Sequence, residues 1–329
     1  MNPDVSIIIF CYNQTKYISE AIQSILAQTF TNWELLVSDN GSIDGTQEKI
    51  KNFIHDPRIK LLLNDKNETI TKRYKEALSK TRGNFISILY GDDFYMPEKI
   101  EKQLGCFENL SKEWGVVHGP GLTLNQSDGK KVLDSCTKVH GEALKDLLVN
   151  YYDGFINPIS PLVRSECFRI YPSYQDLFVE AECLYFKFAL TYKFFYLDEP
   201  LVVMRQHDTN MRWFSKRNSE VLDTCLERLP TFKEFPKKYS DLLLTMRVKA
   251  LTNSAWQNIR LGIDSNWARS KLISSFRLSF FQSFSIRNLI SLSLTLMPNF
   301  LVIWFNQLIN ILFRRTEQIY IDEPYQKKE

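Results

Sequence analysis

The sequence predicts an α/β fold in which a mostly parallel sheet is flanked by helices and followed by a helical C-terminal extension. Over the first 110 residues, short apolar runs alternate with stretches of helical period. Such regular alternation is typical of a parallel sheet with right-handed crossovers. From about residue 215 the pattern is amphipathic and helical. The chain has 329 residues and 44% hydrophobic residues, enough for a sizeable core.

The elements of the first part follow from local patterns. Val5–Phe10 is a continuous apolar run, as expected for a strand buried on both faces. Lys16–Gln28 has apolar residues at helical spacing. The further strands that we expect are Trp33–Val37, Ile59–Leu63 and Phe85–Leu89. The further helices are Asp44–Ile54 with Ser42 or Asp44 as its cap, Thr71–Lys80, and Met96–Leu110 with Pro97 in its first turn.

The pattern is looser after about residue 115. The expected strands are Val116–Val117, Leu122–Leu124 and Pro158–Val163, and the expected helices are Glu142–Val149 and Glu180–Leu190, before an extended stretch, Phe194–Arg205. We place the boundary of the α/β domain at residue 214, with halves 1–110 and 111–214, and assign 215–329 to the helical region.

Composition excludes some classes of protein. The net charge is only +3, and the 41 basic and 38 acidic residues are interspersed, so nucleic acid is not an expected partner. The six cysteines form no Cys-x-x-Cys pair and are typical of reduced structural thiols in the cytoplasm. The chain starts almost directly on its first strand, so we expect no secretory signal peptide.

The segment Leu289–Phe313 is rich in Leu, Ile, Phe and Trp and ends at Arg314 and Arg315. Pro298 and several Ser and Thr residues interrupt it, whereas a spanning helix needs about 20 mostly apolar residues. Two amphipathic helices in the membrane interface fit better, which predicts peripheral contact through 289–315 on the inner face of the plasma membrane. The alternative is a C-terminal helix packed on the rest of the protein.

Two adjacent acids, Asp92 and Asp93, follow the strand Phe85–Leu89. Carboxylates at a strand end of an α/β sheet lie in the crevice where such sheets bind ligands. Two together repel one another unless a cation or many donors lie between them, and hard divalent cations with phosphate ligands favour this arrangement. The alternative is a solvated acidic turn before the next helix.

Several strings of the N-terminal part occur in a familiar order. They are Val5-Ser-Ile-Ile-Ile-Phe-Cys-Tyr-Asn13, Ile22-Gln-Ser-Ile-Leu-Ala-Gln-Thr-Phe30 and Trp33-Glu-Leu-Leu-Val-Ser-Asp-Asn-Gly-Ser-Ile-Asp-Gly-Thr46. Together with Asp92-Asp93 they resemble glycosyltransferase family 2, which has the GT-A fold. The resemblance covers about the first 110 residues and continues more weakly to His207. It implies an inverting transfer of a hexosyl or N-acetylhexosaminyl group from a nucleoside-diphosphate sugar.

The resemblance also implies an acceptor and a pathway class. The acceptor would be a hydroxyl of a glycan or lipid-linked glycan, in cell-surface polysaccharide biosynthesis. A catalytically impaired nucleotide-sugar-binding protein of the same fold is the alternative. A sugar-1-phosphate nucleotidyltransferase is a weaker one, because Phe10–Lys16 lacks the glycines that would cradle a triphosphate.

The family pattern assigns the nucleotide to the first two strand ends. Tyr12 has an aromatic face that can stack on the base. Asp39 can accept a hydrogen bond from a base N–H, although Asp39-Asn40-Gly41-Ser42 is also a strong turn sequence. Asn40 replaces the second acid of the family motif.

The family pattern assigns Mn²⁺ or Mg²⁺ to the acidic pair. We expect Asp93 to be the metal ligand, and Asp92 to contact the ribose or a metal-bound water. A further family Asp is replaced by Tyr90. Near the C-terminal limit of the resemblance, His207 is expected to complete the metal site.

Two arginines are expected to contact the donor. Arg73 lies near the family's Ala-Arg-Asn stretch, although ungapped counting puts Tyr74 at the arginine position. Arg205 belongs to a run that resembles the family's Arg-x-His element and can bind phosphate oxygens bidentately.

The catalytic base is the least determined role. An inverting transfer needs a carboxylate to take the acceptor proton. The family places an Asp there, and ungapped counting puts Ala181 at its position. We expect Glu182 to be the base, with Glu180 and then Asp176 as alternatives. The glutamates can equally be first-turn acids that the helix dipole stabilises.

Overall fold

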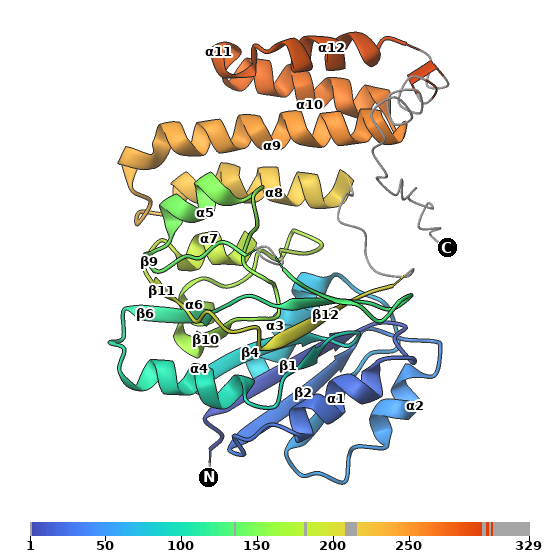
Figure 1. The fold of residues 1–329 in the computed structure, drawn as a ribbon, viewed down its shortest axis with the longest axis vertical. Helices are drawn as coiled ribbons and strands as arrows, with labels where there is room; N and C mark the ends of the chain where they lie inside the picture. Colours follow the sequence, from blue (N-terminus) through green and yellow to red (C-terminus); the bar gives the residue numbers. More distant parts are fainter. Residues whose placement is uncertain are drawn as a thin grey trace. The chain divides into compact units, whose positions relative to one another are not determined.

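The computed structural model describes residues 2–134, 136–180, 183–207, 216–297, 301–302 and 304. The chain divides into two compact units, Met1–Thr209 and Asn210–Glu329. The first is a mixed α/β unit and the second is helical, as Figure 1 shows. The predicted fold class is confirmed.

The first unit is built on an eight-stranded sheet in the order β3-β2-β1-β4-β10-β6-β11-β9. Its parallel half consists of β1 (Val5–Cys11), β2 (Trp33–Asp39), β3 (Ile59–Leu63) and β4 (Phe85–Tyr90). All seven residues of β1 are buried, which explains its continuous apolar run. The carboxyl ends of β2, β1 and β4 therefore lie side by side at one edge of the sheet.

The other half of the sheet is mixed. It consists of β6 (Trp114–His118), β9 (Gly141–Glu142), β10 (Leu162–Arg164) and β11 (Lys193–Tyr196). Strand β10 is antiparallel to both of its neighbours, β4 and β6. The predicted strand Pro158–Val163 is thus shorter and shifted, because Asn157 and Ser160 form a turn before it.

The helices of the parallel half are α1 (Ile18–Leu26), α2 (Thr46–Lys51), α3 (Ile70–Lys80) and α4 (Lys99–Glu108). Three predicted helix starts are too early, and the first is that of α1, which begins at Ile18 and not at Lys16. Helix α2 does not begin at Asp44, because Gly45 has a φ of +90°, which a right-handed helix excludes. Helix α4 begins two residues after Pro97, whose carbonyl accepts from the Thr29 N–H at 2.9 Å in a loop contact.

A second sheet brings a distant part of the sequence to the acidic pair. Its order is β5-β12-β7-β8, with β5 (Phe94–Tyr95), β7 (Leu122–Asn125), β8 (Lys131–Leu133) and β12 (Val202–Gln206). Strand β12 is antiparallel to β5, so its end lies beside the residues that follow β4.

The shorter helices of this unit are α5 (Leu144–Asn150), α6 (Ser165–Ile170) and α7 (Leu184–Phe188). Helix α7 lies within the predicted helix Glu180–Leu190 and ends two residues before its predicted end. All six cysteines of the chain are free thiols, as expected.

The second unit contains α8 (Lys216–Arg228), α9 (Ser240–Leu261), α10 (Ser265–Leu278), α11 (Phe280–Ser283) and α12 (Ile286–Leu294). A core that includes Ala255, Ile259 and Leu272 joins α9 to α10. Helix α9 ends at Gly262, whose φ of +65° suits a left-handed cap. Most of the predicted membrane segment 289–315 lies outside the described residues, and no helix within them is long and apolar enough to cross a bilayer.

Candidate active site

The loops after β1 and β2 are joined by hydrogen bonds at the strand ends. The Asn13 N–H donates to Ser42 Oγ at 2.8 Å, and the Ile43 N–H donates to Asn13 Oδ1 at 3.0 Å. Asn13 has a φ of +53°, a conformation that asparagine tolerates better than most residues. These bonds fix the backbone next to Tyr12, whose side chain is 36% exposed. Tyr12 therefore offers an accessible ring on an ordered loop.

The Asp39 carboxylate organises the turn after β2. One oxygen accepts from the N–H groups of Gly41 and Ser42 at 3.1 and 2.9 Å and from Gln47 Nε2 at 2.7 Å. The other accepts from the Ser42 hydroxyl. Asp39 is fully buried, so these contacts match the turn role that the sequence left open. A nucleotide base would have to take the place of one of these donors.

Asn40 and Gly41 hold the neighbouring loop against this turn. Asn40 Nδ2 donates to the Glu68 carbonyl, and the Glu68 N–H donates back to Asn40 Oδ1, both at 3.0 Å. Gly41 has a φ of +78°, and a Cβ there would lie 2.6 Å from the carbonyl carbon of Lys66. Asn40, which replaces the second acid of the family motif, thus holds the loop around Glu68 by two hydrogen bonds.

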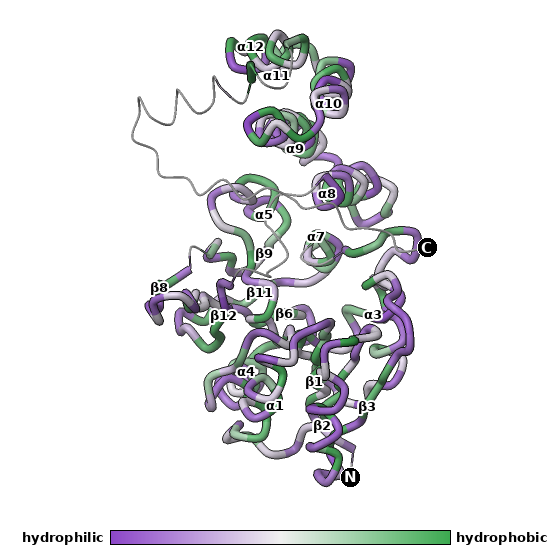
Figure 2. Tube along the Cα trace, turned by 90° about the vertical axis from the view of Figure 1, so that its right-hand side faces the viewer, coloured by the Kyte–Doolittle hydropathy of each residue, from purple (hydrophilic) through white to green (hydrophobic). Residues whose placement is uncertain are grey.

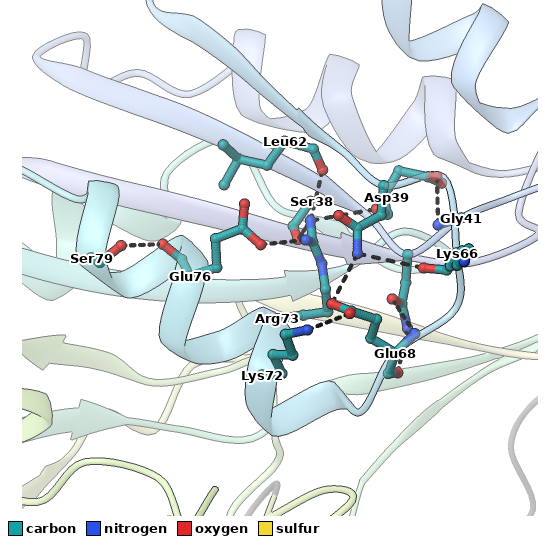
Figure 3. A network of polar contacts seen from close by, with 12 residues as sticks. Ser38, Asp39, Gly41, Leu62, Lys66, Glu68, Lys72, Arg73, Glu76 and Ser79 are labelled. Atoms are coloured by element: carbon teal, nitrogen blue, oxygen red, sulfur yellow. Dashed lines mark hydrogen bonds and ion pairs between the residues drawn. The ribbon is translucent and has the colours of Figure 1, made fainter.

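Arg73 supports the same strand ends from inside the protein (Figure 3). Its guanidinium donates to Ser38 Oγ at 2.9 Å and to the Leu62 carbonyl at 2.8 Å, and it pairs with Glu76 at 2.5 Å. Arg73 is 1% exposed. This placement does not support the predicted phosphate contact, because the cation is buried and already has these partners.

Asp92 and Asp93 have different surroundings. Asp92 Oδ2 lies 3.3 Å from His207 Nε2. Asp93 Oδ1 instead accepts from the backbone N–H of Arg205 at 2.8 Å. Burial and the Asp92 charge raise the pKa of Asp93 well above its ordinary value. In this structure the carboxylate that faces the His207 imidazole is that of Asp92, and the metal-ligand role expected for Asp93 stays a prediction.

His207 is positioned by an aromatic contact. Its ring stacks on Tyr17, with centroids 4.6 Å apart and planes inclined by 27°. Tyr17 lies directly before α1 and is far from His207 in the sequence. The sequence alone therefore does not indicate this contact. The stacking and the contact with Asp92 place an imidazole at the end of β4, and its expected part in a metal site stays a prediction.

Arg205 has partners that the sequence did not indicate. Its guanidinium pairs with Glu20 of α1 at 2.5 Å and donates to Gln126 Oε1 at 3.1 Å. It also lies over the Phe94 ring, 4.9 Å from the centroid. Because Arg205 is 7% exposed, its predicted pairing with phosphate is not supported here, and it ties β12 to α1.

Asp134 is an acid near the site that the sequence interpretation missed. Its charge contributes to the raised pKa of Asp93. It accepts from Asn157 Nδ2 at 3.0 Å and from the Thr123 hydroxyl. No sequence signal identifies Asp134. It follows a short exposed strand and is distant from the acidic pair along the sequence.

Glu180 lies in a buried ion pair. Its Oε1 is 2.6 Å from Lys187 Nζ, both side chains are 3% exposed, and Oε2 accepts from the Tyr174 N–H at 2.9 Å. A carboxylate held in this way is poorly placed to take a proton from an acceptor, which argues against Glu180 as the base. Glu182 lies outside the described residues, and Asp176 is exposed.

The residues at the end of β4 suit a divalent cation only in part. Among the described residues, no cluster of three or more His, Cys, Asp or Glu side chains is arranged to bind a metal. Asp92 and His207 provide two ligands of suitable chemistry. The remaining positions would have to be filled by a ligand rich in oxygen, such as a diphosphate, or by water.

Comparison with protein families agrees with this geometry. Residues 6–127 match the model described as Glycosyl transferase family 2. The chain is 37% identical over 122 residues to the putative glycosyltransferase EpsE of Bacillus subtilis, covering 36% of this chain and 43% of that protein. It is 41% identical over 113 residues to the UDP-Glc:alpha-D-GlcNAc-diphosphoundecaprenol beta-1,3-glucosyltransferase WfgD of Escherichia coli, covering 34% and 44%. These alignments span less than half of each relative.

Solved structures show the same fold over most of the chain. S. aureus TarS 1-349 in complex with UDP-GlcNAc has a TM-score of 0.66 at 15% identity, covering 100% of this chain and 98% of that one. The mannosyltransferase PcManGT from Pyrobaculum calidifontis, in complex with GDP-Man and Mn²⁺, has a TM-score of 0.58 at 12% identity, covering 96% and 89%. Residues 6–127 of this chain therefore belong to glycosyltransferase family 2, and the unit that contains them has the GT-A fold.

Proposed function

We propose that this chain is an inverting, metal-dependent glycosyltransferase. It moves a sugar from a nucleoside-diphosphate donor to a hydroxyl of a glycan acceptor. The observation that carries the proposal is the convergence of three adjacent strand ends. They bring the exposed Tyr12 ring, the Asp39 turn and the Asp92–His207 pair to one edge of the sheet. Ligands of α/β sheets bind at this edge.

In this proposal the nucleoside binds over the loops after β1 and β2. The Tyr12 ring stacks on the base. Asp39 accepts a base N–H when the Ser42 hydroxyl turns away, since the hydroxyl is the donor that can most easily rotate. Asn13 and the turn after β2 keep both groups in place.

The diphosphate lies at the end of β4. Asp92 and His207 would hold Mn²⁺ or Mg²⁺ together with phosphate oxygens. When bound, the cation offsets the charge that develops on the departing nucleoside diphosphate. Asp93 holds the Arg205 backbone, and so positions His207 two residues later. PcManGT, a structure with Mn²⁺ bound, has the same fold.

Glu182 is the proposed base, since Glu180 is held by Lys187. The acceptor class is inferred from the relatives. EpsE, WfgD and the putative teichuronic acid biosynthesis glycosyltransferase TuaG of Bacillus subtilis, 32% identical over 128 residues, support a role in cell-surface polysaccharide biosynthesis. That alignment covers 50% of TuaG and 39% of this chain. The acceptor would be a glycan or lipid-linked glycan, and the group transferred a hexosyl or N-acetylhexosaminyl unit.

A second candidate is a nucleotide-sugar-binding protein without turnover. Ala181 stands at the position where the family resemblance places the catalytic Asp. This candidate predicts that nucleotides bind and that no sugar is transferred.

One experiment separates the two. The purified full chain is incubated with a panel of UDP-, GDP- and dTDP-sugars and Mn²⁺ or Mg²⁺, and release of nucleoside diphosphate is followed with the nucleotide-dependent change in melting temperature. The proposal expects one donor to be consumed, with an inverted anomeric configuration in the product. Stabilisation by nucleotide without donor consumption supports the second candidate. If no nucleotide stabilises the chain and no donor is consumed, both candidates are refuted.

The base assignment is tested by Glu182→Gln, with Glu108→Gln on the exposed side of α4 as the matched control. Loss of about 100-fold or more in rate for Glu182→Gln alone is expected for a general base. Equal rates for both variants would remove Glu182 from the mechanism.

A further inference from the structure

Helix α12 buries polar side chains and exposes apolar ones, which is the reverse of an ordinary surface helix. Its buried residues include Asn288 and Ser291, whereas Ile286, Leu289 and Ile290 are exposed, with Ile286 at 79%. A helix that only covers a core would turn its isoleucines inward. The exposed side of α12 is therefore apolar.

Three phenylalanines of α11 and the turn after it extend this apolar side. Phe280, Phe281 and Phe284 are all exposed, and Phe281 is 91% exposed. The ring centroid of Phe280 lies 6.0 Å from that of Phe281 and 5.6 Å from that of Phe284. We call the set Phe280, Phe281, Phe284, Ile286, Leu289 and Ile290 the α11–α12 patch.

Polar contacts inside the second unit hold the helices that carry the patch. The Ser279 and Ser285 hydroxyls cap α11 and α12. Asn288 Nδ2 donates to the Ser283 carbonyl at 2.8 Å, which ties α12 to α11. Arg287 donates to Asn253 Oδ1 of α9 at 2.9 Å. The buried polar side chains of α12 thus fix the orientation that exposes its isoleucines, and Figure 2 shows hydrophobic residues along both helices.

The charged residues in the part of the sequence that carries the patch have one sign. Residues 265–297 contain no Asp or Glu. Their basic residues are Arg269, Lys271, Arg277 and Arg287. A second copy of the same surface would bring cations against cations. An anionic lipid surface instead matches both the apolar side chains and the surrounding charge.

We propose that the α11–α12 patch is an interfacial binding site for an anionic membrane surface. The phenylalanines and isoleucines enter the boundary between headgroups and acyl chains, and the basic residues lie at the headgroups. The patch overlaps the membrane segment expected from the sequence only at Leu289 and Ile290. The proposal does not depend on the activity of the first unit.

The test is sedimentation of the full chain with vesicles. Binding is compared for vesicles of phosphatidylcholine alone and of phosphatidylcholine with about a third phosphatidylglycerol, at low and at high salt. We expect binding to the anionic vesicles that weakens as salt rises, because the electrostatic part is screened. The double variant Phe281→Ser/Phe284→Ser should bind at least tenfold more weakly, and Arg277→Gln should reduce the salt dependence.

The matched control is Ile54→Ser, which removes an exposed isoleucine of the first unit. Unchanged melting temperatures show that the variants fold. The proposal is overturned if the chain does not bind anionic vesicles, or if the double variant binds as well as the control. It is also overturned if the double variant instead dissociates a lipid-free oligomer in light scattering, which would make the patch a contact between copies.

Discussion

His207 Nε2 lies 3.3 Å from Oδ2 of Asp92, while the adjacent Asp93 accepts the backbone N–H of Arg205. Two neighbouring carboxylates therefore have separate tasks: one faces the proposed cation, and the other holds the strand that carries the imidazole. The family resemblance also separates the two acids, but it assigns the metal to Asp93 and the ribose or a metal-bound water to Asp92.

This separation predicts different effects of two isosteric changes. Asp92→Asn removes a charged ligand and should weaken Mn²⁺ binding in the presence of nucleoside diphosphate by at least about tenfold. Asp93→Asn keeps an oxygen that can accept from Arg205, and should have a smaller effect. Calorimetric titration with Mn²⁺ measures both, and a larger effect for Asp93→Asn would restore Asp93 as the main ligand.

Gly41 gives a second prediction, about the turn after β2. Alanine there would have a φ of +78° and a Cβ 2.6 Å from the Lys66 backbone. We expect Gly41→Ala to lower the free energy of unfolding by about 1–3 kcal/mol and to weaken nucleotide binding. Gly105→Ala is the control, because its Cβ would meet nothing within 4 Å in helix α4 and should stabilise by about 0.5–1 kcal/mol.

Denaturant unfolding and the nucleotide-dependent shift in melting temperature check this prediction. If both glycine variants unfolded at the same denaturant concentration, the close approach of Gly41 to the Lys66 loop would have no energetic weight.

The strands of the parallel half were predictable because each is a buried run bounded by polar residues. Ile59–Leu63 matches its prediction at both ends, and Val5–Phe10 is one residue short. Helix starts were less predictable, since they depend on features such as the positive φ of Gly45 and the hydrogen bond between Thr29 and Pro97. The hydrogen bond joins residues far apart in the sequence, and a glycine in the sequence does not show by itself that its φ is positive.

The site was predictable as a set of strand ends and not as a set of contacts. A motif identifies Asp39, Asp92 and His207, but a buried arginine that supports backbone looks the same in sequence as one that binds phosphate. In this structure the buried Arg73 guanidinium donates to a backbone carbonyl, and the buried Arg205 guanidinium pairs with a carboxylate of α1. Their partners, Leu62 and Glu20, lie on other elements, so only the tertiary structure identifies them.

The buried pair of Glu180 and Lys187 gives a third prediction. Both side chains are 3% exposed, and Lys187 Nζ also donates to the Pro172 carbonyl at 2.6 Å. Lys187→Met leaves a buried carboxylate without its cation and should cost about 3–5 kcal/mol of unfolding free energy. The double variant Glu180→Gln/Lys187→Met should recover part of this loss.

A double-mutant cycle in urea measures the coupling between the two residues. Additive effects would show that the pair contributes no interaction of its own. If Glu180→Gln abolished transfer while leaving the unfolding curve unchanged, Glu180 would return as a candidate base.

Lys99 provides the fourth prediction, which concerns pH. Its ammonium group is fully buried, donates to the Ser87 hydroxyl and lies 4.3 Å from the Tyr95 ring centroid. Burial lowers the pKa of Lys99 well below its ordinary value. In the unfolded chain the pKa of Lys99 is that of an ordinary lysine, about 10.4. Between the folded and the unfolded pKa, the unfolded chain therefore holds a proton on Lys99 that the folded chain has released.

Across that window stability must rise with pH, since the unfolded state binds more protons. Lys99→Met removes this dependence and should stabilise the protein at pH 7, with a gain that shrinks as pH approaches about 10. Lys102→Met is the matched control on the same helix, because Glu199 and Glu98 raise the pKa of Lys102 and give the opposite sign. Unfolding curves at a series of pH values distinguish the two lysines, and a gain for Lys99→Met that grew with pH would mean that Lys99 is charged in the folded protein.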